Sequence, residues 1–256
     1  MSNRITSKTR RSINTIDIIP RVLCGVVANF LRNPKSLRNR IIPGAFTFLK
    51  LQAAKSVENI DIGRITGIER TYINCSAASY DRVVLCALAK LARPRNFFEI
   101  GTYLGETTLA LAQNHPDATI YTLDLPDLDA AKSAALEMSD EYLFARWDRG
   151  LAFRNTLESA RIRQLTGDSA TFDFTPYTGK IDMAFIDGSH SYSYVKSDTE
   201  EILRILSPSG TIAWHDYPSY PGVYAYLNEL GATLERKIYH INDTGVAFST
   251  RMDLIH

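Results

Sequence analysis

A glycine turn followed by a distant acidic residue is the feature of this sequence with the clearest chemical meaning. Residues 97–100 form an apolar run that ends at Gly101, and the next apolar run ends at Asp124. Glycine lets a chain turn sharply and approach a ligand, because no Cβ stands in the way. A carboxylate roughly 20 residues further on can bind the two hydroxyls of a ribose. This pairing predicts a site for a cofactor that contains a nucleoside.

The residues that follow Gly101 argue against the commonest phosphate-binding loops. A dinucleotide-binding turn needs further glycines where this chain has Tyr103 and Glu106, and Glu106 would place negative charge beside a pyrophosphate. No Gly-Lys pair followed by Ser or Thr marks a Walker loop. A nicotinamide-dependent dehydrogenase is therefore the disfavoured alternative.

Two later apolar runs also end in acidic residues. Residues 181–186 lead into Asp187, and residues 210–214 lead into His215 and Asp216. Neighbouring parallel strands would bring both aspartates to the same edge of a sheet. Two converging carboxylates repel each other unless a cation or a proton lies between them. Oxygen ligands on loops suit Mg²⁺ or a similar ion.

Histidine supplies the other reactive group in this region. His190, three positions after Asp187, can accept a proton near neutral pH when its pKa is unperturbed. Structural roles stay open for the same residues. Asp187 and Asp216 could cap strand ends or helix starts, His190 could cap the following helix, and Asp168 could bind its own backbone in a turn.

The spacing Glu-x-Gly-x-x-x-Gly from Glu99 to Gly105 resembles the first motif of class I S-adenosylmethionine-dependent methyltransferases. The resemblance implies that Glu99 helps to hold the amino end of the methionine part, that the glycine turn lies beneath it, and that Asp124 binds the ribose. It also implies that Asp168 faces the adenine amino group. The implied cofactor-binding residues are Glu99, Gly101, Thr102, Gly105, Asp124, Asp168 and Ser169.

Residues 185–217 resemble the metal-dependent small-molecule O-methyltransferases, including those of the macrocin type that act on antibiotic sugars. The resemblance covers about residues 95–250. It implies a small-molecule acceptor, such as a sugar hydroxyl, whose pKa a divalent cation would lower. The implied catalytic residues are His190, as the base, and Asp187, and the implied metal ligands are Asp187, His215 and Asp216. His215 stands where many relatives have a second acid.

Alternating strand and helix patterns predict the architecture that must position these residues. We expect a Rossmann-like α/β fold with a mostly parallel seven-stranded sheet, an antiparallel C-terminal hairpin turning at 242–245, and helices on both faces. The expected strands are 97–101, 119–124, 162–166, 181–187, 210–215, 235–241 and 245–250. The expected helices are 79–93, 105–114, 128–138, 192–206 and 222–231. Residues 139–160 fit neither pattern and are expected to form an insertion over the site.

Charge separates the front of the chain from the rest. Residues 1–50 hold ten of the 29 Lys and Arg residues but one of the 28 Asp and Glu residues. We expect a basic helical extension at 1–60 and the S-adenosylmethionine-binding domain at 61–256. The extension could cap the domain or contact a membrane surface through residues 1–50. Nucleic acid is not an expected partner, because no aromatic residues are interleaved with the cations.

Composition sets the remaining expectations. The chain has 256 residues, 45% of them hydrophobic and 22% charged, as in an ordinary globular protein. Three cysteines without a Cys-x-x-Cys pair, and the lack of a long apolar run, favour a cytoplasmic protein, with the inner membrane surface as an alternative location. A membrane-associated binding module that has kept the fold and lost catalysis is the non-enzymatic alternative. The sequence does not indicate an oligomeric state.

Overall fold

One mixed sheet organises the described part of the chain, which in this computed structural model comprises residues 57–60, 77–126, 148–217 and 219–252. Its strands lie in the order β1-β7-β8-β6-β5-β2-β3-β4. Their bounds are β1 (Glu58–Ile60), β2 (Asn96–Ile100), β3 (Thr119–Asp124), β4 (Ile162–Thr166), β5 (Ile181–Ile186), β6 (Leu206–Trp214), β7 (Tyr239–Ile241) and β8 (Ala247–Ser249).

The sheet confirms the predicted Rossmann-like fold and adds one strand. Strands β6, β5, β2, β3 and β4 are parallel, while β8 runs antiparallel to both β6 and β7, as expected of a C-terminal hairpin. All seven predicted strands are present. The eighth, β1, pairs in parallel with β7, although residues 58–60 fall at the end of the segment expected to be helical. Pairing with β1 satisfies backbone groups of β7 that would otherwise form an open sheet edge.

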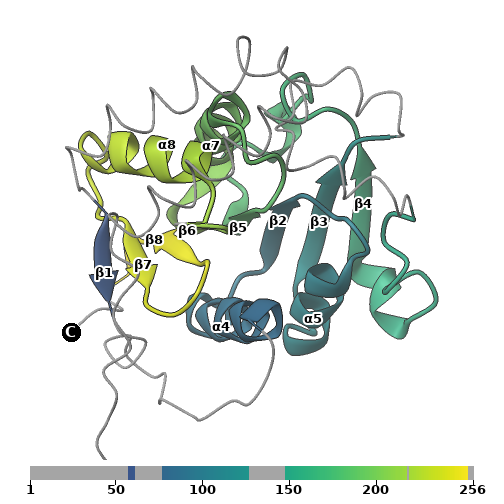
Figure 1. Ribbon diagram of the computed structural model, residues 1–256. Helices are drawn as coiled ribbons and strands as arrows, with labels where there is room; N and C mark the ends of the chain where they lie inside the picture. Colours follow the sequence, from purple (N-terminus) through teal and green to yellow (C-terminus); the bar gives the residue numbers. More distant parts are fainter. Residues whose placement is uncertain (1–56, 61–76, 127–147, 218, 253–256) are drawn as a thin grey trace, which may run out of the picture.

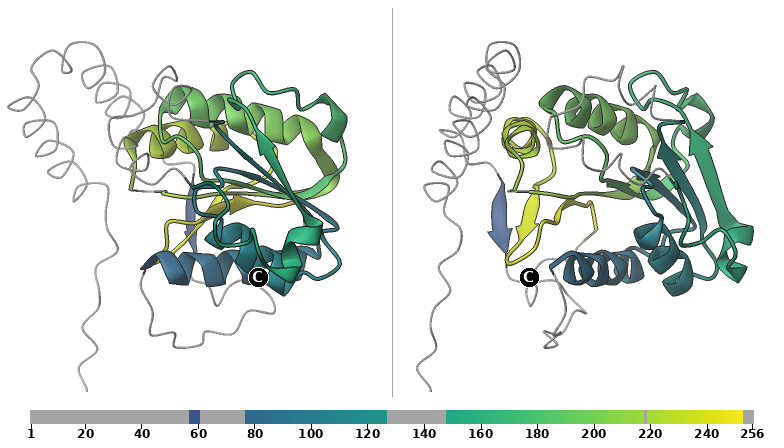
Figure 2. Two further views of the ribbon diagram at one scale, coloured as in Figure 1. Left: turned by 90° about the vertical axis from the view of Figure 1, so that its right-hand side faces the viewer. Right: turned by 45° about the vertical axis from the view of Figure 1, so that its right-hand side comes forward.

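Helices cover both faces of the sheet (Figures 1 and 2). Helices α4 (Ala77–Ala92) and α5 (Glu106–Asn114) lie on one face, and α7 (Tyr192–Ile205) and α8 (Pro221–Gly231) lie on the other. Each face has its own apolar core, and residues such as Leu85 and Phe185 contribute to the first and Ile202 and Trp214 to the second. Because both faces are buried, the strands read as nearly continuous apolar runs.

The path of the chain creates a crevice beside β2. The chain runs outward from β2 through β3 to β4, and then returns to the opposite side of β2 as β5. Ligands of open α/β sheets bind where the strand order reverses, at the carboxyl ends of the strands. Ile100 pairs with Leu123 of β3 and with Ile186 of β5, and Ile186 pairs with Trp214 of β6. The residues that follow these strands are therefore aligned along one edge.

Several predicted segments lie outside the described residues. These are nearly all of the basic extension and its membrane contact, the helix expected at 128–138, and residues 139–147 of the expected insertion. Residues 148–156 are described and form turns before the short 3-10 helix at Leu157–Arg161. Within the residues that can be described, no helix is both long and apolar enough to cross a membrane.

Candidate active site

A hollow opens at the carboxyl ends of β4, β3, β2 and β5, at the crevice that the topology creates. Four of the predicted cofactor residues line this hollow: Gly101, Asp124, Asp168 and Ser169. Asp187, predicted as a catalytic residue and metal ligand, lines it as well. The prediction missed several further lining residues, which include Tyr103, Leu125, Arg149, Gly188, Ser189 and Tyr194.

Gly101 is required where β2 and β5 diverge. Its φ is +100°, in the region that favours glycine. A Cβ at this position would lie 2.0 Å from the backbone oxygen of Asp187. The glycine therefore allows a close approach to the Asp187 backbone, whereas the sequence predicted a close approach to a ligand.

Asp124 sits at the end of β3 with its carboxylate held by three groups. The backbone N–H of Tyr103 donates to Oδ2 at 2.8 Å, and that of Leu125 donates to Oδ1 at 2.8 Å. The Nε of Arg149 lies 3.0 Å from Oδ2, and its guanidinium lies over the Tyr103 ring. Burial raises the pKa of Asp124, although Arg149 and the backbone donors oppose the shift.

Residues 148–153 cover the glycine turn, which explains how Arg149 reaches Asp124. The backbone N–H of Gly150 donates to the Tyr103 carbonyl, and that of Ala152 donates to the Leu104 carbonyl. Phe153 fills the space beside Gly105, where a Cβ would lie 2.6 Å from its ring. This described part of the expected insertion therefore does lie at the site.

Asp168 follows β4 and makes the turn contact that the sequence left open as its structural role. Its Oδ1 accepts the backbone N–H of Ala170 at 2.9 Å, which is the turn contact. The phenol of Tyr194, from α7, donates to both carboxylate oxygens at 3.0 Å, while Asp168 and Ser169 line the hollow. Asp168 thus links the turn after β4 to α7 at the far end of the hollow.

The other three predicted cofactor residues, Glu99, Thr102 and Gly105, are not among the residues that line the hollow. Glu99 is 1% exposed, and it accepts hydrogen bonds from the hydroxyls of Thr108 and Thr122. Burial raises its pKa to about 8, against the two hydroxyl hydrogen bonds, which lower it. Glu99 therefore lies beneath the turn, where it joins β2 to α5 and β3.

Glu99→Gln is expected to make stability less sensitive to pH between about 4.5 and 8. The usual pKa of a glutamate in an unfolded chain is 4.5, whereas folded Glu99 keeps its proton to about pH 8. Between these values the unfolded state binds fewer protons, so the free energy of unfolding falls as the pH rises. Glutamine keeps an acceptor for the two hydroxyls and does not ionise. Melting curves should show a decline in Tm that is smaller in the variant by roughly 5 °C; equal declines would contradict this role.

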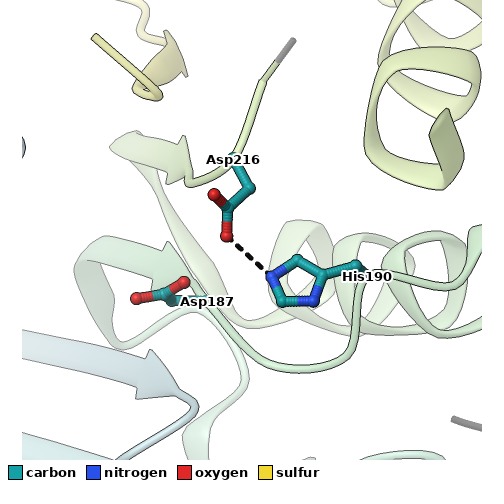
Figure 3. A group of neighbouring side chains, drawn as sticks. All are labelled: Asp187, His190 and Asp216. Atoms are coloured by element: carbon teal, nitrogen blue, oxygen red, sulfur yellow. Dashed lines mark hydrogen bonds and ion pairs between the residues drawn. The ribbon is translucent and has the colours of Figure 1, made fainter. Parts of the chain in front are cut away.

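The acidic and histidine residues predicted at the ends of β5 and β6 come together beside the hollow. The Nε2 of His190 lies 2.7 Å from Oδ2 of Asp216, as Figure 3 shows. The Nδ1 of His215 lies 3.0 Å from Oδ1 of Asp187 and 3.3 Å from Oδ2 of Asp216. The sequence therefore identified four members of one cluster.

A fifth member, Asp81, comes from α4 and was missed. Its Oδ2 lies 3.0 Å from Nε2 of His215 and accepts the backbone N–H of Gly245 at 3.1 Å. Asp81 is buried on the same side of α4 as the core residues Val84, Leu85 and Leu88. Asp81 precedes these three apolar residues at helical spacing, so it falls on the buried side of the helix. A buried acid in such a pattern is a signal that could have indicated its role.

The loop after β6 is held in an unusual backbone conformation. Asp216 has a φ of +61°, which is rare for a residue other than glycine. Its carbonyl accepts the backbone N–H groups of Ser219 and Tyr220, and the Tyr217 N–H donates to the Gly245 carbonyl. The Tyr220 ring stacks on that of His190, with centroids 3.8 Å apart. Both His190 and Asp216 are thus fixed before any ligand arrives.

Charge in the cluster is balanced internally. Burial alone would lower the pKa of His215, but the carboxylates of Asp187, Asp216 and Asp81 outweigh it and raise that pKa far above its usual value. Burial alone would raise the pKa of Asp216, but hydrogen bonds from His190 and His215 hold it well below its usual range. These shifts favour an ionised Asp216 beside a protonated His215 ring.

The donor atoms can be compared with the predicted metal ligands Asp187, His215 and Asp216. Both ring nitrogens of His215 face carboxylate oxygens at 3.0 Å, and a histidine that donates from both nitrogens has no lone pair for a metal. It is His190 that completes, with Asp187 and Asp216, a group whose donor atoms all lie within 4.8 Å of one another. The Nδ1 of His215 thus contacts the carboxylates of both predicted acids, Asp187 and Asp216.

Comparison with known proteins gives the class that this fold and site define. Residues 98–217, slightly under half of the chain, match a family model described as a methyltransferase domain. The match includes the glycine turn, Asp124, Asp168 and the whole acid and histidine cluster except Asp81. It confirms the enzyme class predicted from the sequence, an S-adenosylmethionine-dependent methyltransferase.

Many solved structures are similar to the chain, and three of them are informative about bound cofactors. The O-methyltransferase TomG from Streptomyces achromogenes, involved in tomaymycin synthesis and solved with S-adenosylmethionine, is 19% identical, with a TM-score of 0.46 over 80% of this chain and 88% of that one. Cofactor-bound Rv0187 from MTB is 17% identical, with a TM-score of 0.46 over 81% and 89%. The S-adenosylhomocysteine-bound methyltransferase PaMTH1 from Podospora anserina is 18% identical, with a TM-score of 0.43 over 66% and 79%. A comparison with curated protein sequences finds no match.

Proposed function

We propose that this protein transfers the methyl group of S-adenosylmethionine to a hydroxyl of a small molecule, with a sugar-like polyol as the acceptor class. The observation that carries this proposal is the position of Asp187. It lines the hollow that contains Gly101, Asp124 and Asp168, and its Oδ1 also belongs to the acid and histidine cluster. A methyl donor bound in the hollow and an acceptor bound at the cluster would therefore both lie beside Asp187.

The hollow suits the donor at each of its parts. Asp124 can accept hydrogen bonds from the ribose hydroxyls, and the apolar side chains of Leu123 and Leu125 beside it suit the adenine ring. Asp168 lies where it can accept from the adenine amino group. Gly101 lines the hollow with backbone alone, so the methionine part could approach that backbone closely.

The cluster can orient an acceptor hydroxyl and remove its proton. The donor atoms of Asp187, His190 and Asp216 lie within 4.8 Å of one another, so one hydroxyl oxygen can contact more than one of them. In our proposal Asp187 orients the hydroxyl and His190 accepts its proton. Ionised Asp216 stabilises the imidazolium that forms on His190.

The bond changes of this reaction balance without a further reactant. The acceptor oxygen attacks the methyl carbon, which the positive sulfur already makes electrophilic. The carbon–sulfur bond breaks toward sulfur, which leaves S-adenosylhomocysteine and a methyl ether. The hydroxyl proton passes to His190, so the protein's task is to align the two reactants and hold that proton.

A divalent cation, implied by the sequence resemblance, would lower the pKa of the acceptor hydroxyl when bound. Asp187 and Asp216 would be joined as ligands by His190 and not by His215. Metal binding would use the side chains of His190 and Asp216, which are hydrogen-bonded to each other in this structure. The proton transfer described above therefore uses the side chains alone.

Calorimetric titration with S-adenosylmethionine and S-adenosylhomocysteine tests the proposed donor. We expect both to bind at micromolar concentrations, whereas reduced nicotinamide dinucleotide should not bind, because Tyr103 and Glu106 stand where that cofactor needs glycines. No heat from either adenosyl compound at about 1 mM would refute donor binding. A screen of hydroxylated compounds for S-adenosylhomocysteine release would then identify the acceptor.

Asp124→Asn is expected to weaken S-adenosylmethionine binding by about 10- to 100-fold. A hydrogen bond to a charged group contributes about 1.5–3 kcal/mol, and the amide replaces one of the two acceptor oxygens with a donor. The dissociation constant from calorimetry measures the effect. Asp117→Asn is the matched control, since Asp117 is exposed in the turn before β3. Equal affinities for the two variants would remove Asp124 from the donor site.

A further inference from the structure

Three carboxylates converge on a single ring at the acceptor end of the site. Asp81 lies at Nε2 of His215, and Asp187 and Asp216 lie at Nδ1, all within 3.3 Å. Within the described residues, the ion pairs of these three carboxylates are made with histidines, and His190 is the other partner of Asp216. Three converging negative charges require a compensating positive charge.

The position of His215 is fixed from several directions. Its backbone N–H donates to the Ile186 carbonyl at 3.0 Å, which keeps it at the end of the sheet between β5 and β8. The edge of its ring packs against Phe185. Gly245 leaves room for the Asp81 carboxylate that contacts Nε2 of the ring, because a Cβ there would lie 3.1 Å from that carboxylate.

We propose that His215 is the fixed cation of the acceptor site: its ring holds Asp187 and Asp216 in place and does the charge-balancing work that a divalent metal would otherwise do. Asp81, on α4, is then the positioning residue that keeps Nδ1 turned toward the other two carboxylates. The proposal rests on the proposed methyl transfer and assigns two residues of the same site. In this proposal His215 does not contact the acceptor and affects it through Asp187 and Asp216.

The arrangement makes a clear prediction for metal binding. With His215 in place, the two acids already share a positive charge and should bind a free divalent ion poorly. His215→Asp removes that charge and adds an oxygen ligand beside Asp187 and Asp216. Three carboxylates at one sheet edge, without a cation among them, provide the kind of oxygen ligands that Mn²⁺ and Mg²⁺ bind.

Titration with Mn²⁺, followed by electron paramagnetic resonance of the free ion, tests this inference on the full chain. We expect no binding by the wild-type protein below about 1 mM and at least tenfold tighter binding by His215→Asp. Asp187→Asn in the His215→Asp background should abolish the gain. His115→Asn serves as the control, because His115 lies before β3, at the opposite end of the strands from the site.

The outcomes separate this inference from the proposed function. Tight Mn²⁺ binding by the wild-type protein that Asp187→Asn removes would overturn it, and this measurement remains possible if the His215 variants fail to fold. A His215→Asp variant that melts normally and gains no affinity would also overturn it. Calorimetry with S-adenosylmethionine on the same samples tests the donor site independently, so a failure of either proposal can be recognised.

Discussion

His190→Gln is expected to lower the rate of methyl transfer by about 10²- to 10⁴-fold, the usual contribution of a general base. Glutamine can fill much of the space against Tyr220 and can donate to Asp216, but it cannot accept a proton. Because His190 does not line the donor hollow, the affinity for S-adenosylmethionine should stay within a factor of about three. Single-turnover release of S-adenosylhomocysteine, with an acceptor identified by screening, measures the rate.

Two further variants show whether the loss of activity is specific to His190. His115→Gln, far from the acceptor end, should retain the wild-type rate. Asp216→Asn should lose activity as well, because it removes the carboxylate that lies 2.7 Å from Nε2 of His190. If His190→Gln turns over as fast as the wild-type protein, the base must be another group, and Asp187, which lines the hollow, becomes the candidate.

Gly101→Ala is expected to destabilise the fold and to abolish donor binding together. The new Cβ would lie 2.0 Å from the Asp187 carbonyl oxygen, and that backbone cannot move away without disturbing the pairing of β2 with β5. The cost should exceed the 1–2 kcal/mol of a left-handed backbone alone and reach about 4 kcal/mol or more. Urea unfolding measures the loss of stability, and calorimetry measures donor binding.

Gly179→Ala is a matched control for this prediction. Gly179 also has a positive φ, of +68°, but no atom lies within 4 Å of a Cβ built at this position. Its substitution therefore tests the backbone strain without the steric clash, and the difference between the two variants isolates the close approach of β2 and β5. Equal losses at both positions would show that the clash at Gly101 is relieved by movement of the backbone.

The strands themselves and the edge of the sheet that carries the site were predictable because both follow from local patterns. Apolar runs that alternate with helical segments predict a parallel sheet, and such sheets bind ligands at the carboxyl ends of their strands. Gly101, Asp124, Asp187 and Asp216 each follow or end one of those runs, so their convergence needed no long-range information. The hairpin turn at 242–245 was equally local, and the antiparallel pairing of β7 with β8 confirms it.

Contacts between distant segments could not be predicted in this way. Asp81 is 134 residues from His215, and no local pattern specifies that α4 delivers it to the end of β6. Arg149 reaches Asp124 from a segment without clear periodicity, and Tyr194 reaches Asp168 across the hollow from α7. The partners of a side chain depend on how layers stack, which a strand or helix pattern does not encode.

The same limit explains the positions of Glu99 and β1. The resemblance to class I methyltransferases implied that Glu99 helps to hold the methionine part, and it did not indicate that the hydroxyls of Thr108 and Thr122 bind this carboxylate below the turn. Residues 58–60 carry no strong strand pattern of their own, and they become a strand because β7 offers an edge for pairing. In both cases the tertiary environment decides what the local sequence leaves open.

Apart from Asp187 and His190, the cluster around His215 draws on α4, on the loop after β6 and on Gly245 in the C-terminal hairpin, whereas the donor hollow is assembled from residues 100–194. The two ends of the site are thus encoded in largely separate stretches of the chain. Mutations in the hairpin or in α4 can therefore change which compound is methylated, while the binding of the methyl donor stays the same. Directed evolution of new acceptors can follow the same division, with mutagenesis confined to one of the two stretches.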